Sequence, residues 1–436
     1  MVTGVKRRSA SPGRTTSASS TPQQRRKPVP EQRPLRLAAV LFVLSMQAVT
    51  LLLALEHLPS LKSSPILVAS VGVLSLAGIS IGAKHAFMTC GCTFSPSAIF
   101  FAVTGWSAAI DLVLALALRG ATTLGKFYVE TGEEYFKSSW GYFALLWDGT
   151  AHYALQLTLA HATLLGRPCR VAGLVWAGSI INSMPVLLLG GASGVFSSHI
   201  KPSTALNAPY VLVPIAYLAS ILEDGRELGS AKRGVAAKDG VNGRWGDTTA
   251  VEKYFWAAFH FGAICVHALR AAVVLGSQAP LALWWGVHVD PILLMTSRAS
   301  HGFVRVQCLV FFFYYVPYHA WALYDLLLVS TTNSDATTTA SRAKGVRKSR
   351  RATWATIFAG GYLQAQVTFI GAAALRWVGF QPLVSEPPSE PPPCKDWLGS
   401  CQALASATQL MPHAGWALGV ALIVLPAAWA VRCLRD

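Results

Sequence analysis

Two residues four positions apart, Asp148 and His152, stand in an otherwise apolar stretch and have the chemistry of a proton-handling pair. Residues at this spacing share one face of a helix, so the carboxylate and the imidazole can touch. Such a pair can orient a proton, or it can hold the cationic headgroup or amine of a ligand. The alternative is a buried polar network that fixes helix packing, and the residues leave both interpretations open.

Further polar residues fall at a similar depth once the chain is divided into helices that cross a membrane. Asp111 and Asp148 lie at about the same distance from the non-cytosolic ends of two adjacent antiparallel helices. Asn207 and Tyr210, one turn apart, can reach the same layer, and Asn182 lies near the middle of the helix between. The predicted ligand-binding residues are Asp111, Asp148, Asn207, Tyr210, His152 and Asn182.

The amino-acid composition predicts that the helices that carry these residues span a membrane. Of the 436 residues, 53% are hydrophobic and only 13% are charged, whereas soluble domains carry about 25% charged residues. Apolar runs long enough to cross about 30 Å of hydrocarbon recur along the chain. The predicted fold class is all-α, a polytopic bundle of transmembrane helices.

The apolar runs predict about ten spans, with an additional apolar segment at 280–296. This segment is short and contains Pro280 and Pro291, so it is predicted to be re-entrant or interfacial rather than a span. The predicted spans are 37–58, 64–83, 97–118, 140–165, 171–193, 204–222, 252–276, 306–329, 352–375 and 412–432.

The net charge of +16 follows the pattern that orients membrane proteins. Across the ten predicted spans, 26 of the Lys and Arg residues fall on the side of the N-terminus and 9 on the other. The positive-inside rule therefore predicts that both termini are cytosolic. It also accounts for the basic residues without nucleic acid, which is not expected as a partner.

A faint internal repeat divides the spans into two modules. Ala177-Gly178-Ser179 is followed by Asn182, and Ala359-Gly360-Gly361 is followed at the matching place by Gln364. The repeat predicts two tandem four-helix modules after two extra helices. The predicted parts are a disordered basic arm (1–36), two N-terminal helices (37–95), a first module (96–222), a cytosolic linker (223–250) and a second module (251–432), which includes a basic insert (330–351) and a Pro-rich non-cytosolic loop (380–405).

Several other features bound the function. The cysteines follow no metal spacing, and no nucleotide-binding or soluble-hydrolase motif occurs, so neither a metal nor a cofactor is expected. Cys394 and Cys401 share the Pro-rich loop, where a disulfide is one alternative and free thiols are the other. The second module is poorer in candidate site residues, and Arg270 is expected to extend towards the membrane interface. The arm at 1–36 is also consistent with an organelle transit peptide.

Blocks of sequence in the right order resemble the transmembrane 6 superfamily over roughly residues 40–435. The blocks are WDGTAHYALQLTLAHA from Trp147, VAGLVWAGSI, NAPYVLVPIAYLAS and FAGGYLQAQVTFIGAAALR. The resemblance implies ten spans built around two EXPERA domains, the module shared with the emopamil-binding sterol isomerases and the sigma-two receptor. It also implies residence in the endoplasmic reticulum and a part in triglyceride and sterol handling.

The resemblance to the isomerases is incomplete at the residues that catalyse double-bond migration. Asp148 matches the second Glu, Asn207 matches the Asn, and Tyr210 stands at the Trp position. Asp111 falls on or beside the first Glu, whereas the His position carries Ala108. The expectation is therefore a non-catalytic protein of the endoplasmic reticulum membrane that binds sterol or another lipid and modulates lipid metabolism, export or storage. The alternatives are a sterol Δ8–Δ7 isomerase, in which Asp148 and Asp111 would be catalytic, and a membrane scaffold without a ligand.

Overall fold

The computed structural model describes residues 32–58, 60, 63–231, 250–290, 293, 302–329, 338–377 and 413–435. Most of the predicted basic arm, most of the linker and the loop that carries Cys394 and Cys401 lie outside the described residues. A disulfide there therefore stays one of two predicted alternatives.

The described residues form helices joined by turns, with no strand among them. The α-helices are α1 (Gln32–Glu56), α2 (Pro65–Thr89), α3 (Pro96–Leu118), α4 (Lys126–Thr131), α5 (Ser139–Trp147), α6 (Tyr153–Leu164), α7 (Arg170–Gly191), α8 (Ala208–Ala231), α9 (Ala250–Val274), α10 (Pro280–His288), α12 (Gly302–Val310), α13 (Val316–Tyr324), α14 (Thr338–Trp377) and α16 (His413–Arg435). The shorter 3-10 and π segments are η2 (Glu134–Lys137), η3 (Asp148–His152), η4 (Gly194–His199), η5 (Pro202–Asn207), η7 (Phe311–Tyr315) and η8 (Asp325–Val329).

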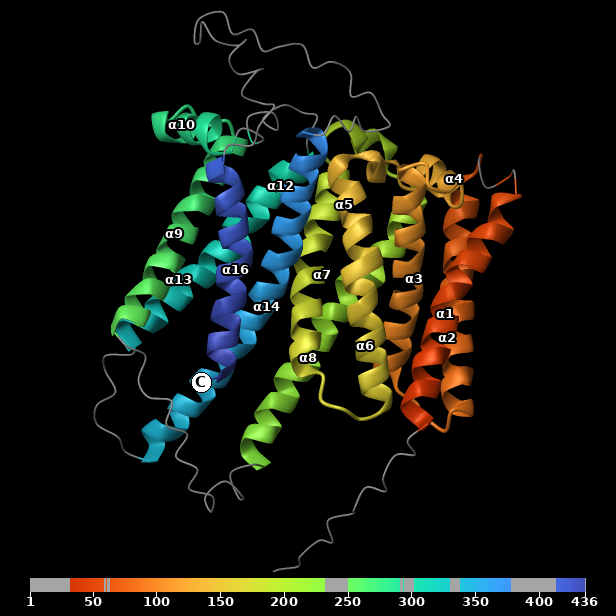
Figure 1. Cartoon of the computed structure of the whole chain (residues 1–436), viewed down its shortest axis with the longest axis horizontal. Helices are drawn as coiled ribbons and strands as arrows, with labels where there is room; N and C mark the ends of the chain where they lie inside the picture. The colour runs from red at the N-terminus through yellow and green to blue at the C-terminus, as the bar shows by residue number, and fades with distance from the viewer. Residues whose placement is uncertain are drawn as a thin grey trace, which may run out of the picture.

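The long helices lie side by side as a bundle, which confirms the predicted fold class (Figure 1). Eight helical segments in the described residues are long and apolar enough to cross a membrane. The other two predicted spans coincide with α5–η3–α6 and with α14, so the count of ten stays a prediction. Short α10 lies across the end of the bundle rather than along it, and 338–351 of the predicted insert belongs to α14.

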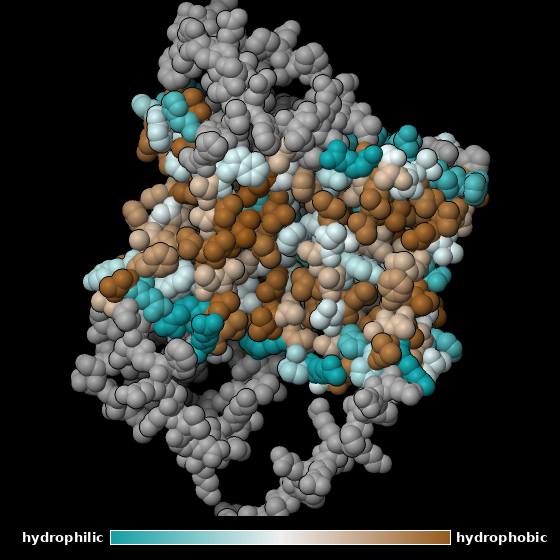
Figure 2. Space-filling view, in the orientation of Figure 1, coloured by the Kyte–Doolittle hydropathy of each residue, from teal (hydrophilic) through white to brown (hydrophobic). Residues whose placement is uncertain are grey.

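The outer surface of the bundle is apolar, as contact with lipid requires. On α2, Ile66, Leu74 and Ile81 are each about 70% exposed. Figure 2 shows hydrophobic residues gathered in a band across the middle of one face, with hydrophilic residues at its upper and lower edges. Such large apolar side chains would be costly in water, and they fit the hydrocarbon core of a bilayer.

Hydrogen bonds join helix ends that the predicted topology places on one side. Arg33 at the start of α1 donates to the carbonyl oxygen of Gly91 just after α2, over 2.8 Å. Arg170 at the start of α7 donates to Thr353, over 3.0 Å. Arg432 near the end of α16 forms an ion pair with Glu252 in the first turn of α9. The ends therefore group as predicted, and the cytosolic assignment of that side stays a prediction.

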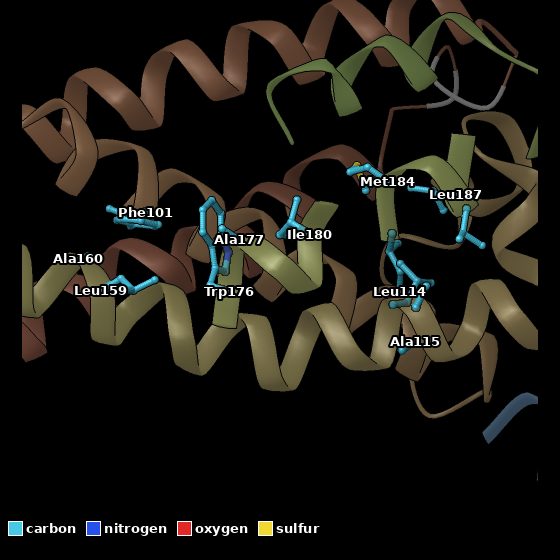
Figure 3. Packing of buried hydrophobic residues seen from close by; sticks show 14 of the residues in the cluster. Phe101, Leu114, Ala115, Leu159, Ala160, Trp176, Ala177, Ile180, Met184 and Leu187 are labelled. Carbon is cyan, nitrogen blue, oxygen red and sulfur yellow. The ribbon is translucent and has the colours of Figure 1, made fainter. Parts of the chain in front are cut away.

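The core of the first half of the chain packs around the indole of Trp176 on α7. This side chain is fully buried, and its ring centroid lies 5.0 Å from that of Phe101 on α3 in an edge-to-face contact. Figure 3 shows these two rings near Leu159 of α6, with Met184 and Leu187 farther along α7. This packing fixes α3, α6 and α7 relative to one another, and the candidate site depends on that arrangement.

The two halves of the chain meet along α7 and α14 with their backbones in contact. A Cβ atom on Gly178 would overlap the carbonyl oxygen of Ile357, and one on Gly360 would overlap the carbonyl oxygen of Val175. The small-residue motifs Ala177-Gly178-Ser179 and Ala359-Gly360-Gly361 therefore lie against each other. Small residues are the usual means by which helices approach closely in a membrane.

Candidate ligand-binding site

A cavity of about 130 Å³ lies inside the first half of the chain. Its walls come from α1, α2, α3, α4, α7, α8 and the short segments between them, so the two N-terminal helices help to enclose it. Four of the six predicted site residues line it: Asp111, Asp148, Asn207 and Tyr210. The other polar side chains in the lining are Ser75, Ser107, Tyr128 and Glu133.

A π-helical turn positions Asp148 in the wall of the cavity. The turn η3 interrupts the helix between α5 and α6 and begins at Asp148. Gly149 permits a close approach to α3, because a Cβ atom there would lie 2.6 Å from the backbone of Leu112. Leu112 follows Asp111 directly, and Gly149 follows Asp148. The close contact therefore brings the carboxyl groups of Asp111 and Asp148 to the same cavity. π turns of this kind often occur at functional sites.

His152 contacts the carboxyl group of Asp148 and does not itself line the cavity. Its Nδ1 lies 2.5 Å from Oδ1 of Asp148, and its Nε2 lies 2.6 Å from Oγ of Ser179. The indole N–H of Trp147 donates to the same Nε2 over 3.1 Å. Since Nε2 accepts from these donors, the ring proton belongs on Nδ1 and is donated to Asp148.

The sequence of contacts Ser179–His152–Asp148 is that of a Ser–His–Asp triad, but the orientation is reversed. Ser179 is fully buried, whereas the side chain of Asp148 is 27% exposed and lines the cavity. A nucleophilic serine must reach its substrate, and this one does not. The group presented to a ligand is the carboxyl of Asp148, and His152 is its positioning residue.

Glu133 is a functional candidate that the sequence analysis missed. It lies in the connection between α4 and η2, is 3% exposed and lines the cavity. Its carboxylate accepts from the hydroxyls of Tyr128 (2.9 Å) and Tyr135 (2.6 Å) and from Nδ2 of Asn207 (2.7 Å). The signal in the sequence was two tyrosines flanking an acid just outside a predicted span, and only the fold shows that this loop turns inward.

Burial raises the pKa of Glu133 from 4.5 to about 7, although the three hydrogen bonds oppose the shift. Burial, with the nearby Glu133 charge, also raises the pKa of the Tyr128 and Tyr135 hydroxyls well above 10. Both hydroxyls therefore stay protonated as donors. The carboxyl of Glu133 changes its charge near neutral pH at one wall of the cavity.

We expect the raised pKa of Glu133 to make the folded protein less stable as the pH rises from about 4.5 to about 7. In this window the folded protein retains a proton that the unfolded chain has released, so the stabilisation is full below the window and absent above it. The raised pKa corresponds to about 3 kcal/mol. Thermal unfolding in detergent from pH 4.5 to 8 measures it, and Glu133→Gln should flatten the dependence. Glu130→Gln on the exposed face of α4 is the control, and an unchanged slope in Glu133→Gln would contradict the prediction.

The structure places two other residues differently from expectation. Asn182 lies at the contact of α7 with the second half, where its Nδ2 donates to Gln364 over 2.6 Å and its Oδ1 accepts from Tyr315 over 3.0 Å. It does not line the cavity. Arg270 does not extend to the interface, because it is fully buried and pairs with Asp290 over 2.7 Å.

The ionisable side chains of the cavity are mainly acidic, and they stand in a mostly apolar lining with a few hydroxyl groups and one amide. Its lining contains three carboxyl groups and no Lys, Arg or His. Within the part of the chain that the structure describes, no three His, Cys, Asp or Glu residues lie together as metal ligands would. The cavity therefore suits an organic ligand with an apolar body and a donor group.

Comparison with known proteins shows the family to which the chain belongs. Residues 47–232 match the family described as transmembrane 6 superfamily member 2-like, transmembrane domain. Transmembrane 6 superfamily member 2 of Rattus norvegicus is 30% identical over 315 residues, which cover 71% of this chain and 76% of that protein. The chain belongs to the transmembrane 6 superfamily.

Other comparisons agree with this membership. The Homo sapiens superfamily member 2 is 29% identical over 342 residues, covering 77% of this chain and 83% of that protein. No solved structure matches. The matched domain at 47–232 contains every residue that lines the cavity, so the cavity lies within the part of the chain typical of the transmembrane 6 superfamily.

Proposed function

We propose that this member of the transmembrane 6 superfamily is a non-catalytic protein of the endoplasmic reticulum membrane that binds a sterol or another lipid. The bound lipid occupies the cavity of the first half, and binding modulates lipid metabolism, export or storage. The observation that carries the proposal is a cavity in which Asp111, Asp148 and Glu133 face a mostly apolar lining. Buried acidic groups inside a membrane are costly, and they are kept where they have a partner or a purpose.

The lining defines the polar end of the ligand. Carboxylates accept hydrogen bonds, and the lining offers no cation for an acidic headgroup. The ligand therefore presents a hydroxyl or an amine. A cavity of about 130 Å³ is comparable with one that takes a benzene-sized molecule, so it holds the headgroup and about one ring. The remainder of the lipid lies along the apolar walls of α1 and α2.

Photolabelling tests the proposal. The purified protein in lipid nanodiscs is irradiated with a photoreactive sterol that keeps its 3-hydroxyl group, and labelled peptides are identified by mass spectrometry. We expect Asp148→Ala to reduce labelling about tenfold or more, because a lost charge-assisted hydrogen bond in a buried site costs about 1.5–3 kcal/mol. Glu130→Gln, an exposed carboxylate near the same end of the bundle, should label like the wild type. Unchanged labelling of Asp148→Ala would refute sterol binding at this cavity.

The hydrogen bond between His152 and Asp148 favours one alternative, a sterol Δ8–Δ7 isomerase. Double-bond migration needs an acid–base group over the ring, and a carboxyl held by an imidazole has that chemistry. Complementation of a host that lacks its sterol isomerase separates the two functions. Rescue that depends on Asp148 would establish the enzyme, whereas failure by an expressed and inserted protein supports the non-catalytic function. A scaffold without a ligand would fail both complementation and labelling.

A further inference from the structure

A chain of buried hydrogen bonds runs through the second half of the protein, apart from the ligand cavity. Nδ1 of His260 lies 2.8 Å from Nδ1 of His319, and Nε2 of His319 lies 2.5 Å from the hydroxyl of Tyr362. The same hydroxyl lies 2.5 Å from Nε2 of His267. All four side chains are at most 1% exposed. This series of hydrogen bonds begins at His260 on α9 and passes through His319 on α13 and Tyr362 on α14. It ends at His267, which lies about 10 Å farther along α9 than His260.

Both ends of this chain carry a nitrogen with no partner. Nε2 of His260 and Nδ1 of His267 are buried and make no hydrogen bond to any group that the structure describes. Most buried polar groups in proteins are paired, so two unpaired nitrogens at the two ends of one hydrogen-bonded path call for an explanation. The hydrogen-bonding atoms within the series are all paired. The two unpaired nitrogens, Nε2 of His260 and Nδ1 of His267, stand at its two ends.

The geometry permits two proton arrangements of equal charge. A neutral imidazole donates through one nitrogen and accepts through the other, and a phenol hydroxyl does both. In the first arrangement His260 donates to His319, His319 donates to Tyr362, and Tyr362 donates to His267. In the second arrangement every donor and acceptor is exchanged. No group carries a charge in either arrangement.

We propose that His260, His319, Tyr362 and His267 form a proton-conducting path within the second half of the protein. A proton binds the bare Nε2 of His260, and each hydrogen bond of the chain passes its proton to the next acceptor. Water supplies the proton that binds His260, and a second water accepts the proton released from Nδ1 of His267. One proton enters, one leaves, and the four side chains are left in the second arrangement. The first arrangement is restored when the Tyr362 hydroxyl rotates and each imidazole exchanges its proton for one on its other nitrogen, which returns it to its first tautomer. Chains of histidines inside membranes are typical of proton relays.

Ion pairs flank the path at both ends. Beyond His267 on the same helix, Arg270 pairs with Asp290, whose Oδ1 is buried without a partner in the described part of the chain. On the side of His260, Arg351 pairs with Asp325. Each arginine therefore has a carboxylate partner, which offsets part of its charge at that end of the path. The described residues also offer no metal-binding cluster to account for the histidines.

Proton flux into vesicles tests the path. The full-length protein is reconstituted into liposomes that contain a pH-sensitive dye, and a potassium gradient with valinomycin sets the voltage. We expect wild-type flux above that of protein-free vesicles, and Tyr362→Phe should reduce the excess about tenfold or more, because the phenyl ring cannot relay a proton. Tyr315→Phe is the matched control, since Tyr315 is equally buried nearby but donates to Asn182. His267→Gln is a second variant, because an amide keeps hydrogen bonding without relaying protons.

The outcomes decide the proposal. Wild-type flux equal to that of protein-free vesicles overturns it, as does flux retained in folded Tyr362→Phe or folded His267→Gln. An equal loss in Tyr315→Phe also overturns it, because the effect would then be one of packing. Glu130→Gln, on the exposed face of α4 in the first half, should leave the flux unchanged, since this residue plays no part in the path.

Discussion

Gly178→Val is expected to prevent the two halves of the chain from packing together. The new Cβ atom would overlap the carbonyl oxygen of Ile357, which is backbone and cannot move aside as a side chain can. Overpacking of a buried position costs about 1–3 kcal/mol, and a clash between two helix backbones should exceed that range. The variant should yield little monodisperse protein on size exclusion and should unfold at a lower temperature in detergent.

A glycine that faces open space supplies the matched control. Gly262 lies in the middle of α9 and has no atom within 4 Å of where a Cβ would be, so Gly262→Val should fold like the wild type. Gly360→Val should repeat the defect of Gly178→Val from the other helix, because its Cβ would overlap the carbonyl oxygen of Val175. Equal stability of Gly178→Val and Gly262→Val would contradict the proposed role of the contact.

The helices could be predicted from the sequence because their length and composition are imposed by the bilayer. A run such as 97–118 has one physical use when about twenty residues are apolar, and α3 occupies 96–118. Pro280, Pro291 and the shortness of their segment likewise predicted that 280–296 would not cross. In its described part, α10 lies across the end of the bundle (Figure 1). Boundaries followed less well, since α14 extends fourteen residues into the predicted insert.

The candidate site was only partly predictable, because helical periodicity gives depth and local faces but not how helices rotate against one another. Asp148 and His152 are four residues apart, and their contact follows from that spacing. Asn182 has a suitable depth, yet α7 turns it towards α14 instead of the cavity. Glu133 lies in a connection, where neither periodicity nor span prediction applies, and its inward direction comes from Tyr128, Tyr135 and Asn207.

Arg270 shows the same limit in the second half. An arginine near the end of an apolar helix normally extends to the interface, and the sequence offered no reason to expect otherwise. Its partner, Asp290, is twenty residues away in the segment that begins with α10. Only the return of that segment onto α9 creates the pair, and this is a tertiary contact that no local pattern encodes.

Asp290→Asn is expected to destabilise the protein by about 3–5 kcal/mol, because it leaves the Arg270 guanidinium buried without a counter-charge. The amide is nearly isosteric with the carboxylate, so lost packing contributes little. Thermal unfolding in detergent measures the change, and Glu130→Gln, which removes an exposed carboxylate, should cost well under 1 kcal/mol.

The double variant Arg270→Met with Asp290→Leu distinguishes charge from shape at this pair. Replacing both members by apolar residues removes the buried charges together, and such replacements of buried ion pairs are often neutral or stabilising. The double variant should therefore be more stable than Asp290→Asn alone, although it alters more atoms. If it were less stable than the single variant, the contribution of the pair would lie in its hydrogen bonds to Trp285 and neighbouring groups and not in charge compensation.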